Sequence, residues 1–502
     1  MSRPQPRNVL SRDALALAGL LIATAWVRVW TLRTIDLGGD ATYKWYLVRS
    51  WSYANPWVFD HHSARFAINV PIWITQQLFG THPNGMFVTP LLASVAQVPL
   101  LYGCGRALGS RASGVLACLG LLWFEPMVDA SSQLLPGIFQ ATYVLAALYC
   151  VLRFARAPEA DRHFLLLAGL GLFLAYLAMV TSVYVLPGLL LAVWLIRRRV
   201  RDVLSLSGTF AALLACETLG YALSSSYRFG QLQLILHTHT DVKPTGFWGL
   251  FGRYSALPLD WRAVLAAWSS AFAVWLVTRL ARGAHARQPG AVALWLAPAS
   301  LLAGMTFGVK SLDPIIPATD FSIRYCDVLM PLIALCLAAA LCWIARRLLA
   351  GRRSPAAVLP LTAAAALALT TWGASALYRP ATEHAFEVTD RQWRMLNAAL
   401  DNGIPIVGSN RGDHFQMKTL TCIQWGYLQE RHLLKDGALS PIKLGKARLR
   451  DDTHRYLSRP DPGADHVARA LRTRSCVVTA QRRSAEPKLA LDFQPGPGCS
   501  LP

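Results

Sequence analysis

Long apolar segments recur along almost the whole chain and are separated by short polar connections. A helix needs about 20 consecutive apolar residues to cross the hydrocarbon core of a bilayer. About eleven windows of that kind, with few charges, occur in the 502 residues. Their approximate limits are 13–32, 84–107, 112–128, 134–153, 164–181, 183–197, 203–223, 262–281, 290–309, 323–345 and 355–377. The pattern predicts an all-α polytopic membrane protein, with the division between the fifth and sixth windows left open.

Arginine is concentrated in alternate connections between these windows. The basic connections contain Arg3, Arg7 and Arg12, Arg106 and Arg111, Arg153, Arg156 and Arg162, residues 197–201, Arg279, Arg282 and Arg287, and residues 346–353. The positive-inside rule assigns such connections to the cytoplasm. The other connections, 33–83, 129–133, 224–261 and 310–322, are then expected outside, together with the tail from Tyr378. The first window is expected to anchor the chain with its N-terminus in the cytoplasm.

Composition agrees with a membrane protein, since 54% of the residues are hydrophobic and only 15% are charged. The net charge of +21 resides in short connections and forms no basic stripe interleaved with aromatics, so membrane lipids are expected partners and nucleic acid is not. The cysteines in apolar windows have no metal-ligand spacing. If the tail is extracytoplasmic, one pair among Cys422, Cys476 and Cys499 could be oxidised, and the sequence does not choose the pair.

The chain divides into two expected domains, a transmembrane module at 1–377 and a soluble extracytoplasmic domain at 378–502. In the latter, "DRQWRMLNAALDNG" predicts an amphipathic helix ended by Gly403, and "IPIVGS" and "SCVVTA" predict strands of a small α/β fold. In the first outer loop, 33–83, two segments mix aromatic, aliphatic and polar residues at helical spacing. We expect 41–51 and 66–79 to be helices lying in the membrane interface.

Asp40 follows the first window in "TIDLGGDATYKWYLVRSW". A carboxylate close to the lipid boundary is costly to desolvate, so it is retained mostly where it lines a wet cavity or does chemistry. A purely structural alternative is that Asp40 caps a helix that begins near Thr42. Position alone does not separate these two interpretations.

Three sequence features together resemble a known class of enzymes. They are the acidic residue in the first outer loop, "NVPIWITQQLFG" before the second window, and "DFSIRYCDVLMPLIAL" at the start of a late window. The chain resembles the GT-C class of polyprenyl-phosphate-dependent glycosyltransferases, in particular the protein mannosyltransferase and aminoarabinose transferase group. That class often has Asp-Glu in the first loop, whereas here Ala41 follows Asp40. A second carboxylate must come from elsewhere or be absent, and the candidates are Asp36, Asp60, Glu125 and Asp129.

The resemblance implies transfer of a sugar from a polyprenyl-phosphate donor to an acceptor on the extracytoplasmic face of a bacterial inner membrane. The acceptor could be lipopolysaccharide, another envelope glycan or a protein. Asp40 is the expected general base, because an acceptor hydroxyl gains from a carboxylate that takes its proton. Arg324 is the favoured ligand of the donor phosphate, since guanidinium binds phosphate oxygens in a fork, although it could instead snorkel at the interface. Further candidates for substrate binding are Tyr325, Lys310, His61, His62, Arg65, Tyr43, Arg228 and Arg253.

No cofactor or metal is expected. The pairs His61-His62 and His237-x-His239 stand beside Asp60 and Asp241, but such spacing is weak support for a divalent cation site. Two other function classes compete with the glycosyltransferase. A transporter or flippase for a lipid-linked saccharide should show internal repeats, which the sequence lacks. A non-catalytic assembly protein with the same fold is suggested by the missing Glu after Asp40.

Overall fold

The computed structural model of the chain describes residues 7–32, 40–49, 62, 64–156, 162–224, 230–231, 233, 244–257, 259–282, 290–318, 327–349, 385–402, 406–408, 456–457, 478–482 and 491–495. The chain separates into two compact units. The bundle unit consists of Met1–Thr31, Leu91–Ala130 and Pro136–Arg379, and the mixed unit of Leu32–Pro90, Ser131–Leu135 and Pro380–Pro502. The predicted boundary at 377/378 stays a prediction. The mixed unit joins the first loop to the C-terminal region.

Eight helical segments among the described residues are long and apolar enough to cross a membrane. They are α1 (Arg7–Trp30), η2 with α4 (Pro83–Phe87 and Val88–Ala107), α7 (Pro136–Arg156), η3 with α9 (Val180–Val185 and Leu186–Arg197), α10 (Val200–Ser224), α13 (Leu259–Arg282), α14 (Gly290–Phe307) and α16 (Leu329–Leu349). Two shorter apolar helices are α5 (Arg111–Trp123) and α8 (His163–Ala178). Every predicted window except 355–377 overlaps one of these helices, and that window lies outside the described residues. The chain is a multi-pass membrane protein, as predicted.

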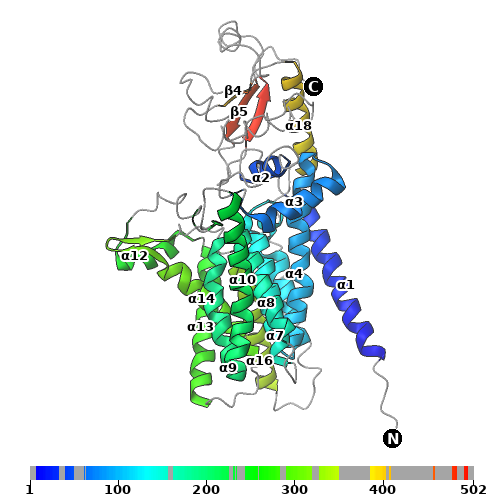
Figure 1. Cartoon of the computed structure of the whole chain (residues 1–502). Coiled ribbons are helices and arrows are strands. Elements are labelled where there is room, and N and C mark those ends of the chain that lie inside the picture. Colours follow the sequence, from blue (N-terminus) through cyan, green and yellow to red (C-terminus); the bar gives the residue numbers. More distant parts are fainter. Residues whose placement is uncertain are drawn as a thin grey trace. The chain divides into compact units, whose positions relative to one another are not determined.

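The helices of the bundle unit run side by side (Figure 1), with α8 against both α7 and α10, α14 against α9, and α16 against α5. Small residues permit the closest approach. A Cβ atom added to Gly188 on α9 would lie 2.4 Å from the carbonyl oxygen of Leu296 on α14. Beside it, Ser300 Oγ donates to the carbonyl of Tyr184 at 2.6 Å, and the Gly188 N–H donates to the same hydroxyl at 3.0 Å. The Ser300 side chain of α14 thus bonds to the backbone of η3 and of α9.

The window at 112–128 is not one helix, which corrects the prediction. Helix α5 ends at Trp123, Phe124 is extended, and a separate short helix, α6 (Glu125–Ser131), follows. The cause is Pro126, which has no N–H to donate to the carbonyl four residues earlier, that of Leu122. Arg28 of α1 supplies the missing donor, because its Nη1 donates to the Leu122 carbonyl at 3.0 Å.

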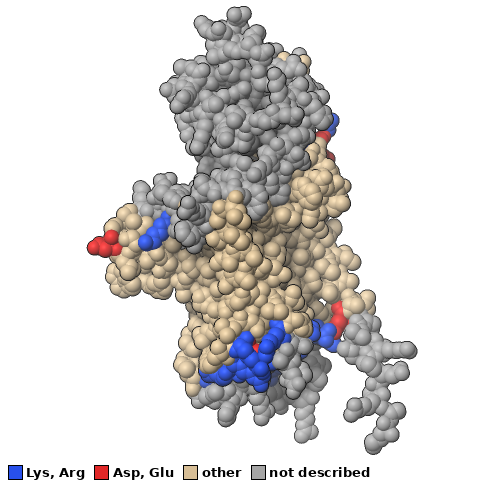
Figure 2. Space-filling model, in the orientation of Figure 1, with Lys and Arg blue, Asp and Glu red and all other residues tan. Residues whose placement is uncertain are grey.

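Basic side chains gather at one end of the bundle unit (Figure 2). Helices α4, α7 and α9 each finish with arginine in the last turn, namely Arg106, Arg153 with Arg156, and Arg197. At the same end Asp13 of α1 accepts a hydrogen bond from Tyr102 Oη at 2.8 Å. It also pairs with Arg106 and, at 2.9 Å, with Arg111. These bonds fix the beginning of α1 to the hairpin formed by α4 and α5.

The mixed unit contains the helices α2 (Asp40–Arg49), α3 (Phe66–Phe79), η2 (Pro83–Phe87) and α18 (Ala385–Asp401). The helices predicted in the first loop and at the start of the C-terminal region are therefore present. The described strands of this unit form one sheet in the order β4 (Tyr456–Leu457), β3 (Ile406–Gly408), β5 (Val478–Arg482), β6 (Leu491–Pro495). The two predicted strands are β3 and β5, which pair in parallel, while β4 and β6 are antiparallel to their neighbours. Cys422, Cys476 and Cys499 lie outside the described residues.

Candidate active site

Asp40 is the first residue of α2. The positive end of a helix dipole stabilises a negative charge at this position, so the backbone suits a carboxylate whether it caps the helix or acts on a substrate. The backbone of Asp40 and Tyr43 is described and their side chains are not. Asp36, Asp60 and His61 lie outside the described residues. The roles assigned to them stay predictions.

Helix α2 is fastened to its neighbours by buried side chains. Lys44 is fully buried, and its Nζ donates to the carbonyl of Leu134 at 3.1 Å. Trp45, also fully buried, donates through Nε1 to the carbonyl of Thr81 at 3.1 Å. The carbonyl of Trp45 accepts from Gln76 Nε2 of α3 at 2.8 Å. Since Leu134, Thr81 and Gln76 all belong to the mixed unit, α2 has a defined position within it.

His62 and Arg65 precede α3 and are buried, with 2% and 8% of their surface exposed. The carbonyl of His62 accepts a hydrogen bond from Asn69 Nδ2 at 2.9 Å and one from the Arg65 N–H at 3.4 Å. This turn holds an imidazole and a guanidinium at the N-terminal end of α3. Such groups suit an anionic ligand, which agrees with the predicted roles without testing them.

Helix α3 turns three of its four polar residues inward and much of its apolar surface outward. Asn69, Thr75 and Gln76 are buried, whereas Trp73, Ile74, Leu78 and Phe79 are exposed. Thr75 Oγ1 lies 2.9 Å from Thr89 Oγ1, so the inward face is hydrogen-bonded. This arrangement is typical of a helix whose outer side contacts lipid rather than water.

Several predicted site residues belong to the bundle unit instead. Glu125 begins α6, and its side chain is not described, while Asp129 lies half-buried in the same helix. Lys310 is half-buried in strand β1 (Val309–Leu312), which forms a hairpin with β2 (Ile315–Pro317). Arg228, Arg324 and Tyr325 lie outside the described residues.

Arg253 has a structural partner at the end of α14. It lies in η4 (Arg253–Ala256), directly after α12 (Phe247–Gly252). Its Nη2 donates to the carbonyls of Met305 at 3.1 Å and Thr306 at 3.0 Å. The guanidinium therefore caps carbonyls in the last turn of α14, a role that the sequence did not suggest.

Two ionisable residues inside apolar windows received no role from the sequence. Arg28, only 2% exposed, donates to Ser94 Oγ at 3.1 Å, to the Leu121 carbonyl at 2.8 Å and to Leu122. Glu217 on α10 accepts the Gln231 N–H at 3.2 Å, beside Gly230 with φ of +62°. Charged groups at membrane depth are seldom without function. The position of Arg28 and Glu217 inside apolar windows is therefore the sequence signal that could have identified them. No group of three His, Cys, Asp or Glu side chains suited to a metal occurs within the described part of the chain.

The chain is similar to proteins of known sequence and structure. A family model described as dolichyl-phosphate-mannose-protein mannosyltransferase matches residues 66–221, from α3 to α10. No curated protein matches by sequence. ArnT from Cupriavidus metallidurans bound to undecaprenyl phosphate has 13% identity and a TM-score of 0.58, with 93% of each chain covered. Its apo state has 14% identity and a TM-score of 0.56 over the same shares.

The archaeal oligosaccharyltransferase AglB from Archaeoglobus fulgidus is more distant. It has 13% identity and a TM-score of 0.44, and the match covers 89% of this chain and 61% of AglB. The fold shared with ArnT and the mannosyltransferase family model confirm the resemblance to the GT-C class that the sequence motifs indicated.

Proposed function

We propose that this protein transfers a sugar from a polyprenyl-phosphate donor to an acceptor at the extracytoplasmic face of the membrane. The observation that carries the proposal is the fold shared with ArnT along 93% of both chains, in a structure of ArnT that holds undecaprenyl phosphate. The mannosyltransferase family model over 66–221 supports the same class of donor. The acceptor is an envelope glycan such as lipopolysaccharide, or a protein.

The chemistry requires two groups. An acceptor hydroxyl is a weak nucleophile at neutral pH, so a carboxylate that takes its proton during attack on the anomeric carbon accelerates the reaction. Asp40 fills this role in our proposal, since it begins a helix that directly follows the first span. As the sugar leaves, negative charge grows on the lipid phosphate and needs cationic donors. Arg324 is the proposed donor, with Arg65 and His62 as further ligands. Displacement in one step inverts the anomeric configuration.

The distribution of charge supports the proposed sidedness. Arginines gather at one end of the bundle unit (Figure 2), and the positive-inside rule places that end in the cytoplasm. Helix α1 begins at this end with Asp13, which is bonded to Arg106 and Arg111, and leads away from it. The loop that carries Asp40 therefore follows the opposite end of α1. We propose a bacterial inner membrane with the C-terminal region in the periplasm.

A transfer assay tests the proposal. Purified full-length protein in liposomes is mixed with labelled polyprenyl-phosphate sugars and candidate acceptors, and the label on the acceptor is measured. We expect transfer by the wild type, and a loss of about 10²-fold or more in Asp40→Asn, the usual size of a general-base contribution. Asp313→Asn makes the same chemical change at an exposed turn and should keep full activity.

Other outcomes of the assay point to the competing classes. Movement of the labelled lipid between leaflets with no labelled acceptor would indicate a flippase. If the protein neither transfers nor moves any donor tried, a non-catalytic assembly protein is favoured. The sequence feature that suggests this class is Ala41, which stands where the family often has Glu. If Asp40→Asn transfers sugar as fast as the wild type, the role of Asp40 is refuted, while the assignment as a glycosyltransferase stands.

A further inference from the structure

We propose that α18, the first helix of the C-terminal region, positions α2 for the reaction, and that Trp393 is the positioning residue. The inference rests on the proposed function, because its consequence runs through Asp40. The C-terminal region then contributes to catalysis by holding the helix that carries the base.

Tyr46 of α2 meets Trp393 of α18 inside the mixed unit. The two rings are stacked, with centroids 6.0 Å apart and an interplanar angle of 30°. Both side chains are buried, with exposed fractions of 0% for Tyr46 and 6% for Trp393. Aromatic pairs in such geometry stabilise a contact beyond the surface that they bury. Tyr46 lies six residues from Asp40, which is less than two helical turns.

A second set of contacts joins α18 to η2, the turn that lies against α2. Phe386 meets Phe87 edge to face, with centroids 5.0 Å apart and an angle of 74°. This turn also supports α2, because Gly85 lies directly against the Trp45 ring. A Cβ atom at Gly85 would come within 2.7 Å of Trp45 Cη2. The turn is thus packed between α18 and α2.

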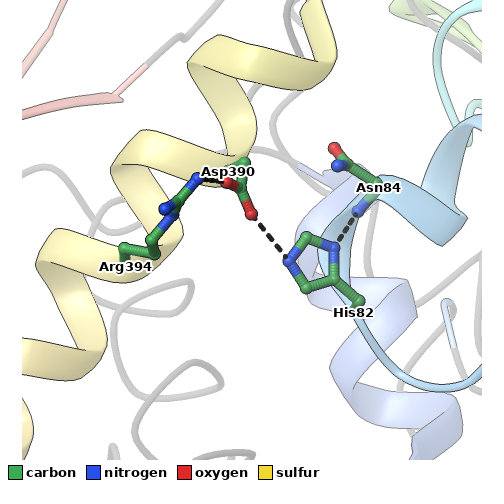
Figure 3. Close-up of polar contacts among 4 residues, drawn as sticks. All are labelled: His82, Asn84, Asp390 and Arg394. Atoms are coloured by element: carbon green, nitrogen blue, oxygen red, sulfur yellow. Dashed lines mark hydrogen bonds and ion pairs between the residues drawn. The ribbon is translucent and has the colours of Figure 1, made fainter.

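A polar contact completes this junction (Figure 3). His82 Nδ1 accepts the N–H of Asn84 at 3.2 Å, so the ring proton of a neutral His82 resides on Nε2. Nε2 faces Asp390 Oδ1 at 3.3 Å. Asp390 is itself paired with Arg394 one turn later in α18. Hydrogen bonds require a particular direction between donor and acceptor. The His82–Asp390 contact therefore fixes the position of α18 along η2 in addition to the packing of Phe386 on Phe87.

Helix α2 depends on such contacts for its orientation. A helix of ten residues is marginal by itself in water, so tertiary packing determines where it lies. Trp45 and Lys44 fasten one side of α2 through the Thr81 and Leu134 carbonyls, and Trp393 supports it at Tyr46. Without the indole, α2 can tilt about its remaining contacts and displace its first residue. Displacements of about 1 Å at a reacting group can lower a rate about 100-fold.

The experiment compares Trp393→Ala with Trp393→Phe in the full-length protein, using the transfer assay with saturating donor and varied acceptor. We expect Trp393→Ala to lower kcat about tenfold or more with KM for the acceptor changed less than about twofold, because a displaced base slows proton transfer more than binding. Trp393→Phe keeps a ring against Tyr46 and should recover most of kcat. Trp26→Ala removes an indole from the exposed side of α1 and serves as the matched control.

A melting curve of each variant separates positioning from folding. If Trp393→Ala is folded and its kcat equals that of the wild type, the inference is refuted while the proposed function stands. Equal losses of kcat in the Ala and Phe variants would also refute it, since the ring contact would then be irrelevant. If the wild type transfers no sugar, the proposed function has failed instead. Should Trp393→Ala not fold, the Phe87 and Phe386 contact is tested in the same way with Phe386→Leu, for which unchanged kcat refutes the inference.

Discussion

Replacing Arg28 by methionine should destabilise the bundle unit, because Arg28 donates to two carbonyls that have no helical donor where α5 ends before Pro126. Its guanidinium donates to Leu121 and Leu122 at the end of α5 and to Ser94 of α4, at 2.8 to 3.1 Å. Methionine has similar length and no donor, so both carbonyls lose their hydrogen bond in a buried place. An unsatisfied buried polar group costs about 1–3 kcal/mol.

The expected loss in the free energy of unfolding for Arg28→Met is smaller than the summed cost of leaving two carbonyls and a hydroxyl without their hydrogen bonds. Removing a buried guanidinium also removes its desolvation cost, which is several kcal/mol for an ion. We therefore expect the free energy of unfolding to fall by about 2–4 kcal/mol, and by about half of that in Arg28→Lys, which keeps a charged donor without the fork.

Equilibrium unfolding in mixed micelles, followed by tryptophan fluorescence, measures these changes. Arg153→Met is the matched control, because Arg153 is exposed and donates only to Tyr149 Oη at 3.3 Å among its described hydrogen bonds. We expect less than about 1 kcal/mol for that variant, the usual range for an exposed charged contact. An Arg28→Met protein as stable as the wild type would refute the reasoning, since Leu121 and Leu122 would then not need the guanidinium.

Two further predictions concern packing and the junction with α18. Gly188→Ala should lower the free energy of unfolding by about 1–3 kcal/mol, because its Cβ would meet the Leu296 carbonyl at 2.4 Å. Gly208 has open space around it, so Gly208→Ala should raise the free energy of unfolding by up to about 1 kcal/mol. Equal shifts in the two unfolding midpoints would contradict the close approach of α9 and α14. His82→Ala and Asp390→Asn, each alone and together, should show a coupling below about 1 kcal/mol in a double-mutant cycle, since both side chains are partly exposed. Strictly additive melting shifts would show that this contact contributes nothing.

The apolar windows predicted the membrane helices well because their length and low charge reflect a single requirement, passage through hydrocarbon. The same measure concealed the break at Phe124. Hydropathy of 112–128 is continuous across Pro126, and only the missing N–H of that residue shows that the helix must stop. The mean hydropathy of the first window likewise concealed Arg28. Its hydrogen-bond partners lie more than 60 residues further along the chain, so local sequence does not reveal them.

The candidate site was predictable only in part. The helices predicted at 41–51 and 66–79 followed from local patterns and are found at Asp40–Arg49 and Phe66–Phe79, and two of the three family motifs pointed to the same loop. The contact between Tyr46 and Trp393 could not be predicted, because it joins residues almost 350 positions apart and neither has a distinctive neighbourhood in the sequence. Likewise, nothing in the sequence around Lys44 indicates that its ammonium group is buried and bonded to the Leu134 carbonyl.

The central claim is that the Asp40 carboxylate takes a proton in the chemical step. A single-turnover experiment with excess enzyme and labelled polyprenyl-phosphate sugar, with donor affinity measured separately, tests it most directly. Asp40→Asn should bind the donor within about twofold of the wild type and transfer the sugar about 10²–10⁴-fold more slowly. A single-turnover rate equal to that of the wild type would contradict the claim.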